Sequence, residues 1–451
     1  MKSKKSADFD ISKLENSFVI GLGSTGVSVL NFLKKNNIKN AFFWDDNPHI
    51  LKSNQYFENY GFKAAKPQDL KITDLDYIFV SPGLDLRKYN LFNNRQDQSI
   101  CKKKLLNDVQ LFCNNLENKS FKLGITGTNG KSTTASMIAK LINDSGLKAF
   151  TVGNIGKPVL DCLSSDFFVI ELSSFQLEQC NNLNLDIAVL LDITPDHLDR
   201  YENIEEYAKA KAKIFENKNA HAIVSVDTKI NEKIFGSLTN KKKTAISVNK
   251  ILDKGFSMLG NKIYKDGNCV LDIKPKFLHS CQNILCAYTC GRLIGVKDEI
   301  LKPSLESFCG LKHRAEYVAK YKNIVFINDS KATNFHSASH LLKSFNNIYW
   351  LAGGSLKKSL SAPKIDLCNI KKAYFFGEAK DILFKLYGEE IVCKKFSKMQ
   401  DAFLQSFKDA NEQSEEVIIA LSPCFPSFDQ FSNFEERGNC FTDLVFDSIK
   451  K

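Results

Sequence analysis

The sequence predicts an α/β protein of three domains, each built on a mostly parallel, doubly wound β-sheet. A length of 451 residues suggests about three domains of ~150 residues each. Short apolar segments that end in polar or glycine turns alternate along the chain with amphipathic helical segments, which is the pattern of parallel β-α units. We expect the domains at residues 1–100, 101–310 and 311–451.

Composition excludes several classes of protein. Hydrophobic residues make up 43% of the chain, yet no apolar run approaches the ~18 residues of a membrane span, and residues 1–13 lack an apolar signal core. Thirteen cysteines without a C-x-x-C pair indicate reduced thiols. The net charge of +11 comes from dispersed lysines without interleaved aromatic residues, which favours anionic small molecules over nucleic acid. We therefore expect a cytoplasmic protein with no membrane insertion and no nucleic-acid partner.

The first apolar segment, residues 18–20, runs into Gly21-Leu-Gly23-Ser-Thr-Gly26 and then into a helical pattern. A second strand, residues 41–44, ends in Asp45, about 20 residues further on. This arrangement is typical of a Rossmann-like domain, whose glycines allow a tight turn and close approach to a diphosphate. The pattern first raises an NAD-dependent dehydrogenase, but any nucleotide diphosphate satisfies the same glycines.

A third strand, residues 77–80, stops at Ser81-Pro82-Gly83. This rigid turn lies at the carboxyl end of a strand, where open α/β sheets bind ligands, although an ordinary loop has the same composition. Residues 90–104 are polar and basic and are expected to form a linker. A helix expected at 105–116 leads into the next domain.

The second domain contains the stretch Gly127-Thr-Asn-Gly130-Lys131-Ser132, between an apolar strand and a helical pattern. Glycines let backbone N–H groups close around a triphosphate, the lysine reaches its outer phosphates, and the serine hydroxyl can ligate Mg²⁺. The stretch is shorter than the strict phosphate-loop pattern, whose first glycine falls at Ile125. It predicts a central domain of the P-loop ATPase kind.

Two further strands of this domain end in candidate site residues. The buried strand 167–170 carries Glu171 at its tip, where a carboxylate is well placed to hold Mg²⁺. The strand 187–191 is followed by a polar stretch in which His197 is flanked by acidic residues. Because these strands neighbour the phosphate loop in the predicted sheet, we expect their ends to face the same crevice.

The rest of the central domain is less informative. A helix expected at 204–215 carries three lysines that composition alone places at the surface, Lys209, Lys211 and Lys213. A strand at 222–226 precedes the polar region 239–275, for which no element is predicted. An apolar helix at 283–294 follows, and the cysteines on and beside it are expected to pack in the core: Cys281, Cys286 and Cys290.

The third domain is predicted from four apolar segments that each end in a polar or glycine turn: residues 323–327, 348–351, 373–376 and 417–421. The first of them runs into Asn328-Asp-Ser-Lys331-Ala-Thr-Asn334. The repetition predicts a second Rossmann-like sheet.

Taken in order, the motifs resemble those of the Mur ligase family over nearly the whole chain, from about Phe18 to Phe441. Six stretches carry the likeness: the phosphate loop, Glu171-Leu-Ser-Ser-Phe-Gln176, Asp196-His-Leu-Asp-Arg-Tyr201, His313-Arg314, Asn328–Asn334 and Leu421-Ser-Pro…Asp429-Gln-Phe-x-Asn-Phe-Glu-x-Arg-Gly438. Six motifs in one order are very improbable by chance.

The resemblance implies a monomeric, ATP-dependent amide ligase of peptidoglycan precursor synthesis, which adds D-glutamate to UDP-N-acetylmuramoyl-L-alanine (UDP-MurNAc-L-Ala) through an acyl phosphate. A ligase for a different amino acid, or a folylpolyglutamate synthetase, is the nearest alternative, because the ATP machinery is shared. A dehydrogenase would leave Lys131 unused, and a non-catalytic nucleotide-binding protein has no use for His197 together with Lys211.

The resemblance also assigns roles residue by residue. Four residues are expected in catalysis, Lys131, Glu171, His197 and Lys211, and Mg²⁺ is expected at Ser132, Glu171, His197 and a carbamylated Lys211. ATP is expected to contact Gly127, Thr128, Asn129, Gly130, Lys131, Ser132, Thr133, Asn283, Arg314, Asp329 and Lys331. Substrate contacts are expected at Thr25, Ser81, Pro82, Gly83 and Asn154 for the UDP-sugar, at Thr333, Lys357, Ser427 and Phe434 for D-glutamate, and at Ser173, Gln176 and Phe428.

The chain departs from the family pattern at several positions. Residues 107–110 read Asn-Asp-Val-Gln, His279 is followed by Ser280, and Pro426 precedes Ser427. After Gly353-Gly354, both Lys357 and Lys358 could receive the carboxylate of D-glutamate.

Overall fold

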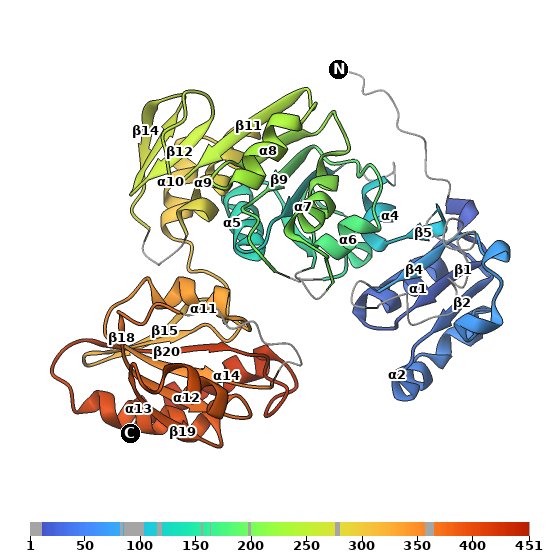
Figure 1. Ribbon diagram of the computed structural model, residues 1–451. Helices are drawn as coiled ribbons and strands as arrows, with labels where there is room; N and C mark the ends of the chain where they lie inside the picture. Colours follow the sequence, from blue (N-terminus) through green and yellow to red (C-terminus); the bar gives the residue numbers. More distant parts are fainter. Residues whose placement is uncertain are drawn as a thin grey trace. The chain divides into compact units, whose positions relative to one another are not determined.

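The computed structural model describes residues 11–81, 84, 103–114, 120–154, 157–162, 164–196, 200–275, 280–356 and 365–450, without the side chains at 12, 336 and 340. The chain divides into two compact units, Met1–Ile273 with Ser280–Leu305, and Lys274–His279 with Glu306–Lys451. The first unit contains two β-sheets and the second contains one (Figure 1). All three are mostly parallel and lie among helices, so the predicted fold class is confirmed.

The first sheet has the strand order β3-β2-β1-β4-β5, with all pairs parallel. Its strands are β1 (Ser17–Ile20), β2 (Ala41–Trp44), β3 (Lys63–Ala64), β4 (Ile78–Val80) and β5 (Leu105–Leu106), and its helices are α1 (Ser24–Lys35) and α2 (Pro48–Ser53). β1 lies between β2 and β4, so the glycine turn after β1 lies beside the ends of both neighbours. The predicted strands and first helix of this domain are confirmed.

The helix expected at 105–116 is wrong at its start. Leu105 and Leu106 form β5, which pairs with β4, and helix α4 begins only at Asp108 and runs to Asn114. The intervening Asn107 explains the boundary, because its side-chain oxygen accepts a hydrogen bond from the Gln110 N–H (2.8 Å) and so caps the helix.

The second sheet has the order β14-β13-β12-β11-β10-β9-β6-β8-β7, and all its pairs are parallel except β12–β13 and β13–β14. Its strands are β6 (Phe121–Thr126), β7 (Ala149–Gly153), β8 (Phe167–Glu171), β9 (Ile187–Leu190), β10 (His221–Ser225), β11 (Lys242–Ser247), β12 (Phe256–Leu259), β13 (Lys262–Lys265) and β14 (Asn268–Asp272). From β6 the chain crosses to β7 on one side of the sheet. From β9 it crosses to β10 on the other side. The crevice between β6 and β9 is therefore the switch point at which open sheets bind ligands.

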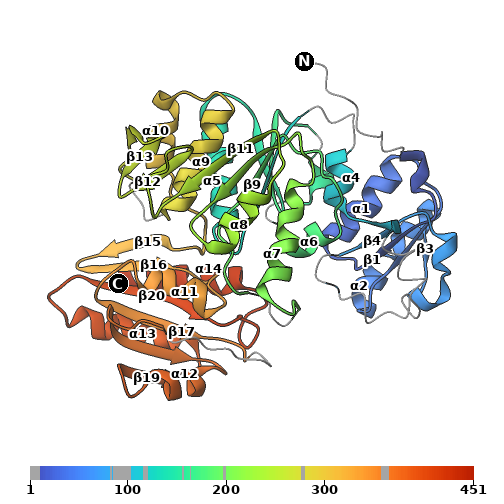
Figure 2. The ribbon, with the colours of Figure 1, turned by 45° about the horizontal axis from the view of Figure 1, so that its top comes forward.

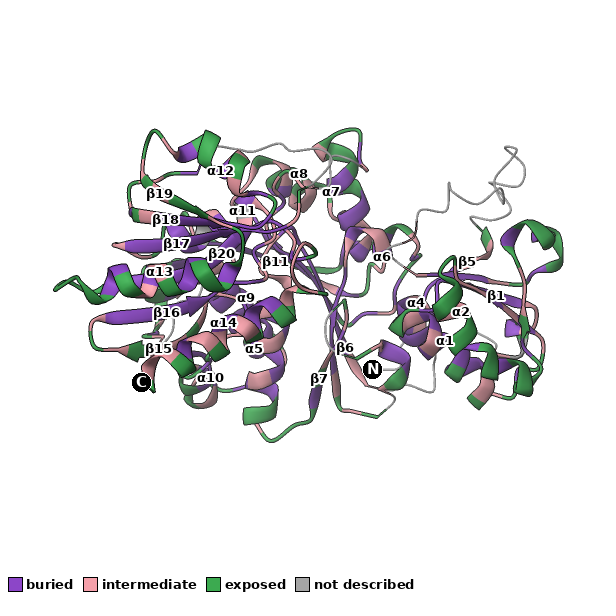
Figure 3. Cartoon of the chain, turned by 90° about the horizontal axis from the view of Figure 1, so that it is seen from below, coloured by how far each residue is buried: buried purple, intermediate pink, exposed green. Residues whose placement is uncertain are grey.

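Helices cover both faces of the second sheet (Figures 2 and 3). One group contains α5 (Lys131–Asp144) and α9 (Cys281–Leu293), which pack on each other, with α10 (Asp298–Glu306) following in the chain. The other contains α6 (Ser174–Glu178), α7 (Ile204–Ala212) and α8 (Lys229–Ser237). Cys286 and Cys290 of α9 are fully buried, as expected for packing thiols, while Cys281 is half-buried. Among the described helices, none is both long and apolar enough to cross a bilayer.

The region 239–275, for which nothing was predicted, forms strands β11 to β14. The outermost strand, β14, is largely exposed along its length, so its sequence has no apolar alternation. A turn signal was nevertheless present, since Asp266 and Gly267 both have positive φ (49° and 81°) and join β13 to β14. Asp-Gly between two strands is the usual sequence of such a tight hairpin turn.

The third sheet has the order β15-β16-β20-β17-β18-β19, parallel except for β15. Its strands are β15 (Glu316–Tyr321), β16 (Ile324–Asn328), β17 (Ile348–Gly353), β18 (Ile370–Phe376), β19 (Val392–Phe396) and β20 (Val417–Cys424). The four predicted strands are confirmed, and the two edge strands β15 and β19 were missed. Edge strands are partly exposed, which weakens their apolar signal.

Two separate apolar layers hold this sheet (Figure 3). Helices α11 (Phe335–Leu342) and α12 (Lys380–Tyr387) pack on one face, around the fully buried Trp350. Helices α13 (Met399–Asn411) and α14 (Phe434–Ile449) pack on the other, around Phe403 and Phe441. Burial of both faces is what makes these strands continuous apolar runs in the sequence.

The glycine turn of the first sheet supplies a stability prediction. A methyl group added at Gly26 would collide with the carbonyl oxygen of Gly21, whereas one added at Gly23 meets nothing within 4 Å. We expect Gly26→Ala to destabilise the protein by about 1–3 kcal/mol, the usual cost of overpacking. The Gly23→Ala variant is the matched control and should melt like the parent protein in calorimetry. Equal melting temperatures for the two variants would contradict the close packing of this turn.

Candidate functional site

The loop between β6 and α5 has a backbone that only glycine fits at two positions. Gly127 (φ +154°) and Gly130 (φ +78°) lie in the region of positive φ that L side chains rarely adopt. A Cβ at Gly127 would lie 2.6 Å from the Cβ of Leu191, and one at Gly130 would collide with the side-chain amide of Asn283. The fourteen-residue helix α5 starts at Lys131, so its free N–H groups face the loop.

Two lysines share one acceptor at this loop. Lys131 Nζ donates to the carbonyl oxygens of Gly127 (3.0 Å) and Thr128 (2.8 Å), and Lys211 Nζ donates to the same Gly127 oxygen (2.8 Å). Only 1% of Lys211 is exposed, whereas Lys209 on the same helix is exposed, so the surface interpretation is wrong for Lys211. Burial lowers the pKa of Lys211 well below its usual value, and the nearby Lys131 lowers it further.

A hydroxyl and a carboxylate meet on the other side of the loop. Ser132 Oγ donates to Glu171 Oε2 (2.5 Å), and Asn154 Nδ2 donates to Glu171 Oε1 (2.9 Å). Ser132 and Glu171 are each only 2% exposed, and Glu171 is the last residue of β8, directly beside β6. Hard oxygen donors of this kind suit Mg²⁺, so two of the predicted metal ligands lie together.

Beyond these two oxygen ligands, the described residues hold no group of three or more His, Cys, Asp or Glu side chains that could bind a metal ion. The predicted ligand His197 lies outside the described residues, as do Pro82, Gly83 and Lys357 with its alternative Lys358.

The chain after β9 is fastened to the phosphate loop. Thr128 N–H donates to the Asp192 carbonyl (2.9 Å), and Thr194 N–H donates to Thr128 Oγ1 (3.0 Å). Burial raises the pKa of the Asp192 carboxyl group. Asn283 of α9 reaches the same region, since its Oδ1 accepts a hydrogen bond from Thr134 Oγ1 (3.2 Å). Lys131, Ser132, Glu171, Lys211 and Asn283 are thus gathered around one loop.

Two of the predicted UDP-sugar residues, Thr25 and Ser81, lie at the glycine turn of the first sheet, whereas Asn154 lies beside Glu171 in the second. Ser81 Oγ donates to the Gly21 carbonyl (2.9 Å), which joins the ends of β4 and β1, and Thr25 opens α1 beside it. Asp45, at the end of β2, accepts a hydrogen bond from Leu22 N–H (2.7 Å). This turn is therefore held by side chains from both neighbouring strands.

Ser173 and Gln176 have a structural task in addition to any contact with substrate. Ser173 caps α6, its Oγ accepts from Gln176 N–H (3.2 Å), and Gln176 Oε1 accepts from Ser173 N–H (3.0 Å). This reciprocal capping fixes the chain directly after Glu171.

The second unit brings most of its predicted residues to the carboxyl ends of β16 and β20. Asp329 accepts hydrogen bonds from Ala315 N–H (3.0 Å) and Ser422 Oγ (2.9 Å), and burial raises its pKa to about 7. Lys331 Nζ lies 3.8 Å from the centre of the Phe434 ring. Arg314, Thr333, Ser427 and Phe428 flank this group along the chain, and Phe428 is 73% exposed.

Sequence reasoning gave Arg437 no role. Its guanidinium is fully buried and donates to the carbonyls of Ser330 (2.8 Å), Phe425 (3.0 Å) and Gly353 (3.4 Å). Burial lowers its pKa to about 10. It thereby ties together the ends of β16, β17 and β20. An arginine in an amphipathic helix normally reads as a surface residue, so only its place within the Glu-x-Arg-Gly438 stretch hinted at this role.

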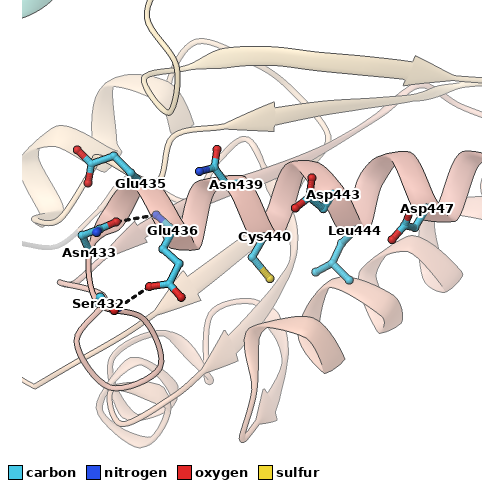
Figure 4. Close-up of a pocket in the computed structure, with 9 residues that line it drawn as sticks. All are labelled: Ser432, Asn433, Glu435, Glu436, Asn439, Cys440, Asp443, Leu444 and Asp447. Carbon is cyan, nitrogen blue, oxygen red and sulfur yellow. Dashed lines mark hydrogen bonds between the residues drawn. The ribbon is translucent and has the colours of Figure 1, made fainter.

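A separate groove of about 570 Å³ runs along α14 (Figure 4). Four of its nine lining residues are acidic, and the full set is Ser432, Asn433, Glu435, Glu436, Asn439, Cys440, Asp443, Leu444 and Asp447. None of the predicted site residues lines it, so it is distinct from the candidate site.

Comparison with known proteins decides the family. Two family models match the chain, the Mur ligase middle domain over residues 125–285 and the Mur ligase MurD-like, N-terminal domain over residues 15–119. The UDP-N-acetylmuramoylalanine--D-glutamate ligase of Rickettsia prowazekii is 38% identical, and the alignment covers 94% of this chain and 96% of that protein. The chain belongs to the Mur ligase family. Ligases of the same name from Caulobacter vibrioides and Wolbachia pipientis are 34% and 31% identical over at least 94% of each chain.

Solved structures of Mur ligases and related enzymes share the fold. UDP-N-acetylmuramate-alanine ligase MurC from Thermotoga maritima matches with a TM-score of 0.60 at 15% identity, over 96% of this chain and 99% of that one. A pseudomurein peptide ligase type C from Methanothermus fervidus matches with a TM-score of 0.58 at 17% identity, over 96% and 100%. These matches agree with the three-sheet architecture described above.

Asp329 supplies a prediction about pH. Its pKa rises from 3.8 to about 7 on folding, so the folded protein binds more protons than the unfolded chain in this window, and stability falls as pH rises through it. At ~1.4 kcal/mol per pKa unit, the loss by pH 8 is at most about 4 kcal/mol. Asp329→Asn, which keeps an acceptor for Ala315 N–H, should therefore gain stability relative to the parent at pH 8 but not at pH 4. Urea unfolding at both pH values measures the free energies of unfolding. The same difference between variant and parent at pH 4 and pH 8 would contradict a pKa of Asp329 raised by burial.

Proposed function

We propose that the protein is an ADP-forming ligase that uses ATP to join D-glutamate to UDP-N-acetylmuramoyl-L-alanine, in the synthesis of peptidoglycan precursors. The observation that carries the proposal is full-length similarity to several relatives that bear this name, at 31–38% identity over at least 94% of each chain. We also propose that it acts as a cytoplasmic monomer, with domains at residues 1–100, 101–310 and 311–451.

The proposed reaction has two steps. An oxygen of the acceptor carboxylate attacks the γ-phosphorus of ATP, ADP leaves, and an acyl phosphate forms. The amine nitrogen of D-glutamate then attacks the carbonyl carbon, inorganic phosphate leaves, and the nitrogen loses a proton. Activation is needed because a carboxylate is a poor electrophile, and both steps build negative charge that cations stabilise.

The phosphate loop supports the first step. Lys131 already lies over the loop carbonyls, within reach of the space that outer phosphates would fill. Ser132 and Glu171 would hold Mg²⁺, directly or through water, together with His197, and the ion would supply charge neutralisation. Gly127 to Thr133 and Asn283 are the proposed ATP contacts in the first unit, and Arg314, Asp329 and Lys331 those in the second.

We also propose that Lys211 is carbamylated. The neutral amine nitrogen attacks CO₂ and loses a proton, which turns a cationic side chain into an anionic oxygen ligand. Burial of Lys211 beside Lys131 favours the neutral amine that this reaction needs. Lys209, two residues earlier on the same helix, is exposed and therefore lacks the burial that lowers the pKa of Lys211.

Substrate contacts complete the proposal. Thr25, Ser81 and Asn154 would receive the UDP-sugar, with Pro82, Gly83, Ser173 and Gln176. Thr333, Ser427, Phe434 and either Lys357 or Lys358 would receive D-glutamate, beside Phe428. Because the fold is shared with ligases of other names, the amino acid must be settled by assay.

The assay measures phosphate release from ATP by the purified protein. We expect release only when UDP-MurNAc-L-Ala and D-glutamate are both present, because the acyl phosphate needs the acceptor carboxylate and turnover needs the amine. L-Lysine and meso-diaminopimelate serve as matched alternatives to D-glutamate. Equal turnover with either of them would refute the proposed specificity.

The carbamate is tested by Lys211→Ala. We expect turnover to fall by about 10²–10³-fold or more, because a charged group at the phosphate loop is lost. Formate or acetate should restore part of the activity by occupying the place of the carbamate. The control is Lys209→Ala, which removes an exposed lysine of the same helix and should retain activity. Full activity of the Lys211 variant would show the assignment to be wrong.

A further inference from the structure

The segment that follows β9, residues 191–196, belongs to no helix or strand, yet it borders the phosphate loop. Its position is held largely by a residue far away in the sequence. Asn231, in the first turn of α8, is fully buried, and no sequence motif drew attention to it.

The side-chain amide of Asn231 binds on both sides of Asp192. Its Nδ2 donates to the Leu191 carbonyl (3.1 Å), and its Oδ1 accepts from the Ile193 N–H (3.3 Å). One amide side chain thus satisfies two buried backbone groups, as a neighbouring strand would. Asn231 is itself held in place, because its own N–H donates to the capping hydroxyl of Thr228 (3.2 Å).

The opposite side of the same segment contacts the phosphate loop. The Asp192 carbonyl accepts from Thr128 N–H (2.9 Å), and Thr128 Oγ1 accepts from Thr194 N–H (3.0 Å). Leu191 lies so close to Gly127 that a Cβ added at Gly127 would lie 2.6 Å from the Leu191 Cβ. Residues 191–194 are therefore clamped between Asn231 and the loop that carries Thr128.

We propose that Asn231 is a positioning residue for the ligase reaction, a role that rests on the proposed function. The hydrogen bonds of its side chain go to Leu191 and Ile193, neither of which is a predicted ligand of ATP, metal or substrate. Through the Asp192 peptide it sets the position of Thr128 in the phosphate loop, and with it the position of residues 191–194 beside that loop.

A second buried asparagine offers a matched control. Asn240 is 7% exposed and donates through Nδ2 to the carbonyls of Asn217 (3.0 Å) and Ala220 (3.2 Å), before the start of β10. Asn240→Ala therefore also removes two hydrogen bonds between a buried asparagine side chain and backbone groups. It leaves residues 191–194 untouched, so any effect found only for Asn231→Ala reports on position and not on loss of stability in general.

The first experiment is amide hydrogen exchange on the full-length protein without added nucleotide or metal. In Asn231→Ala we expect peptides that contain Thr128 and Thr194 to exchange about tenfold faster. Local opening of this segment costs less free energy in the variant, because the hydrogen bonds of Asn231 no longer have to be broken. In Asn240→Ala the same peptides should exchange at the parental rate. This readout does not depend on activity, and identical exchange in the two variants would overturn the proposal.

The second experiment separates the kinetic constants. For Asn231→Ala we expect the Mg²⁺ activation constant and the KM for ATP to rise by roughly 10- to 100-fold, the scale of a small misplacement in an active site. The KM for D-glutamate should stay within about twofold, because its proposed ligands lie in the second unit. A uniform loss of kcat with unchanged constants, or equal effects in Asn240→Ala, would contradict a positioning role.

Asn231→Asp guards against a variant that fails to fold. It keeps the shape and the acceptor for Ile193 N–H but opposes a carboxylate oxygen to the Leu191 carbonyl, so we expect the same pattern of faster exchange. Parental exchange in this variant would also overturn the proposal. If the parent protein used a different amino acid, the proposed function would fail while the exchange result would still decide the role of Asn231.

Discussion

The carbonyl oxygen of Gly127 accepts hydrogen bonds from two lysine side chains, those of Lys131 and the buried Lys211. Two like charges at one acceptor repel, and burial adds a desolvation cost, so this arrangement is stable only with compensation. Glu171 and Asp196 provide part of it, since both raise the pKa of Lys211 against the effects of burial and Lys131. A bound anion, or conversion of Lys211 to an anionic group, would provide the rest. The charge balance of the loop thus favours a bound anion such as phosphate and an anionic group at Lys211, and the proposed reaction needs both.

In the second unit, the buried cation is an arginine whose hydrogen bonds go to neutral groups. This residue, Arg437, binds mainly backbone carbonyls and the hydroxyl of Ser330, and it joins three strand ends. Two nearby residues, His313 and Cys424, have positive φ values of 64°, a backbone state that costs free energy outside glycine. Such states persist where surrounding hydrogen bonds determine them, and here Cys424 N–H donates to the Ala332 carbonyl (2.9 Å). Hydrogen bonds to neutral acceptors therefore hold these strand ends in place, including residues with a strained backbone.

Local patterns in the sequence were sufficient for the buried parallel strands and for the phosphate loop, because both depend on short stretches of apolar residues or glycines. Local patterns were insufficient where contacts between distant parts of the chain decide whether a residue is buried and what it binds. Lys211 reads as one of three similar lysines, and only packing separates it from Lys209. Asn231 and Arg437 bind backbone groups at distant positions, so no spacing in the sequence marks them. The start of α4 was missed because a helix cap leaves no apolar period, and β14 was missed because it is an edge strand that is largely exposed.

The hairpin of β13 and β14 lies at one edge of the second sheet, with strands β12 to β9 between it and β6. Its strands satisfy each other by antiparallel pairing, its turn at Asp266–Gly267 is exposed, and none of the site residues lies on it. Exposed loop tips tolerate inserted sequence better than buried backbone does. This turn is accordingly the place in the central sheet where a fluorophore or an affinity tag could be built into the chain while the phosphate loop keeps its surroundings.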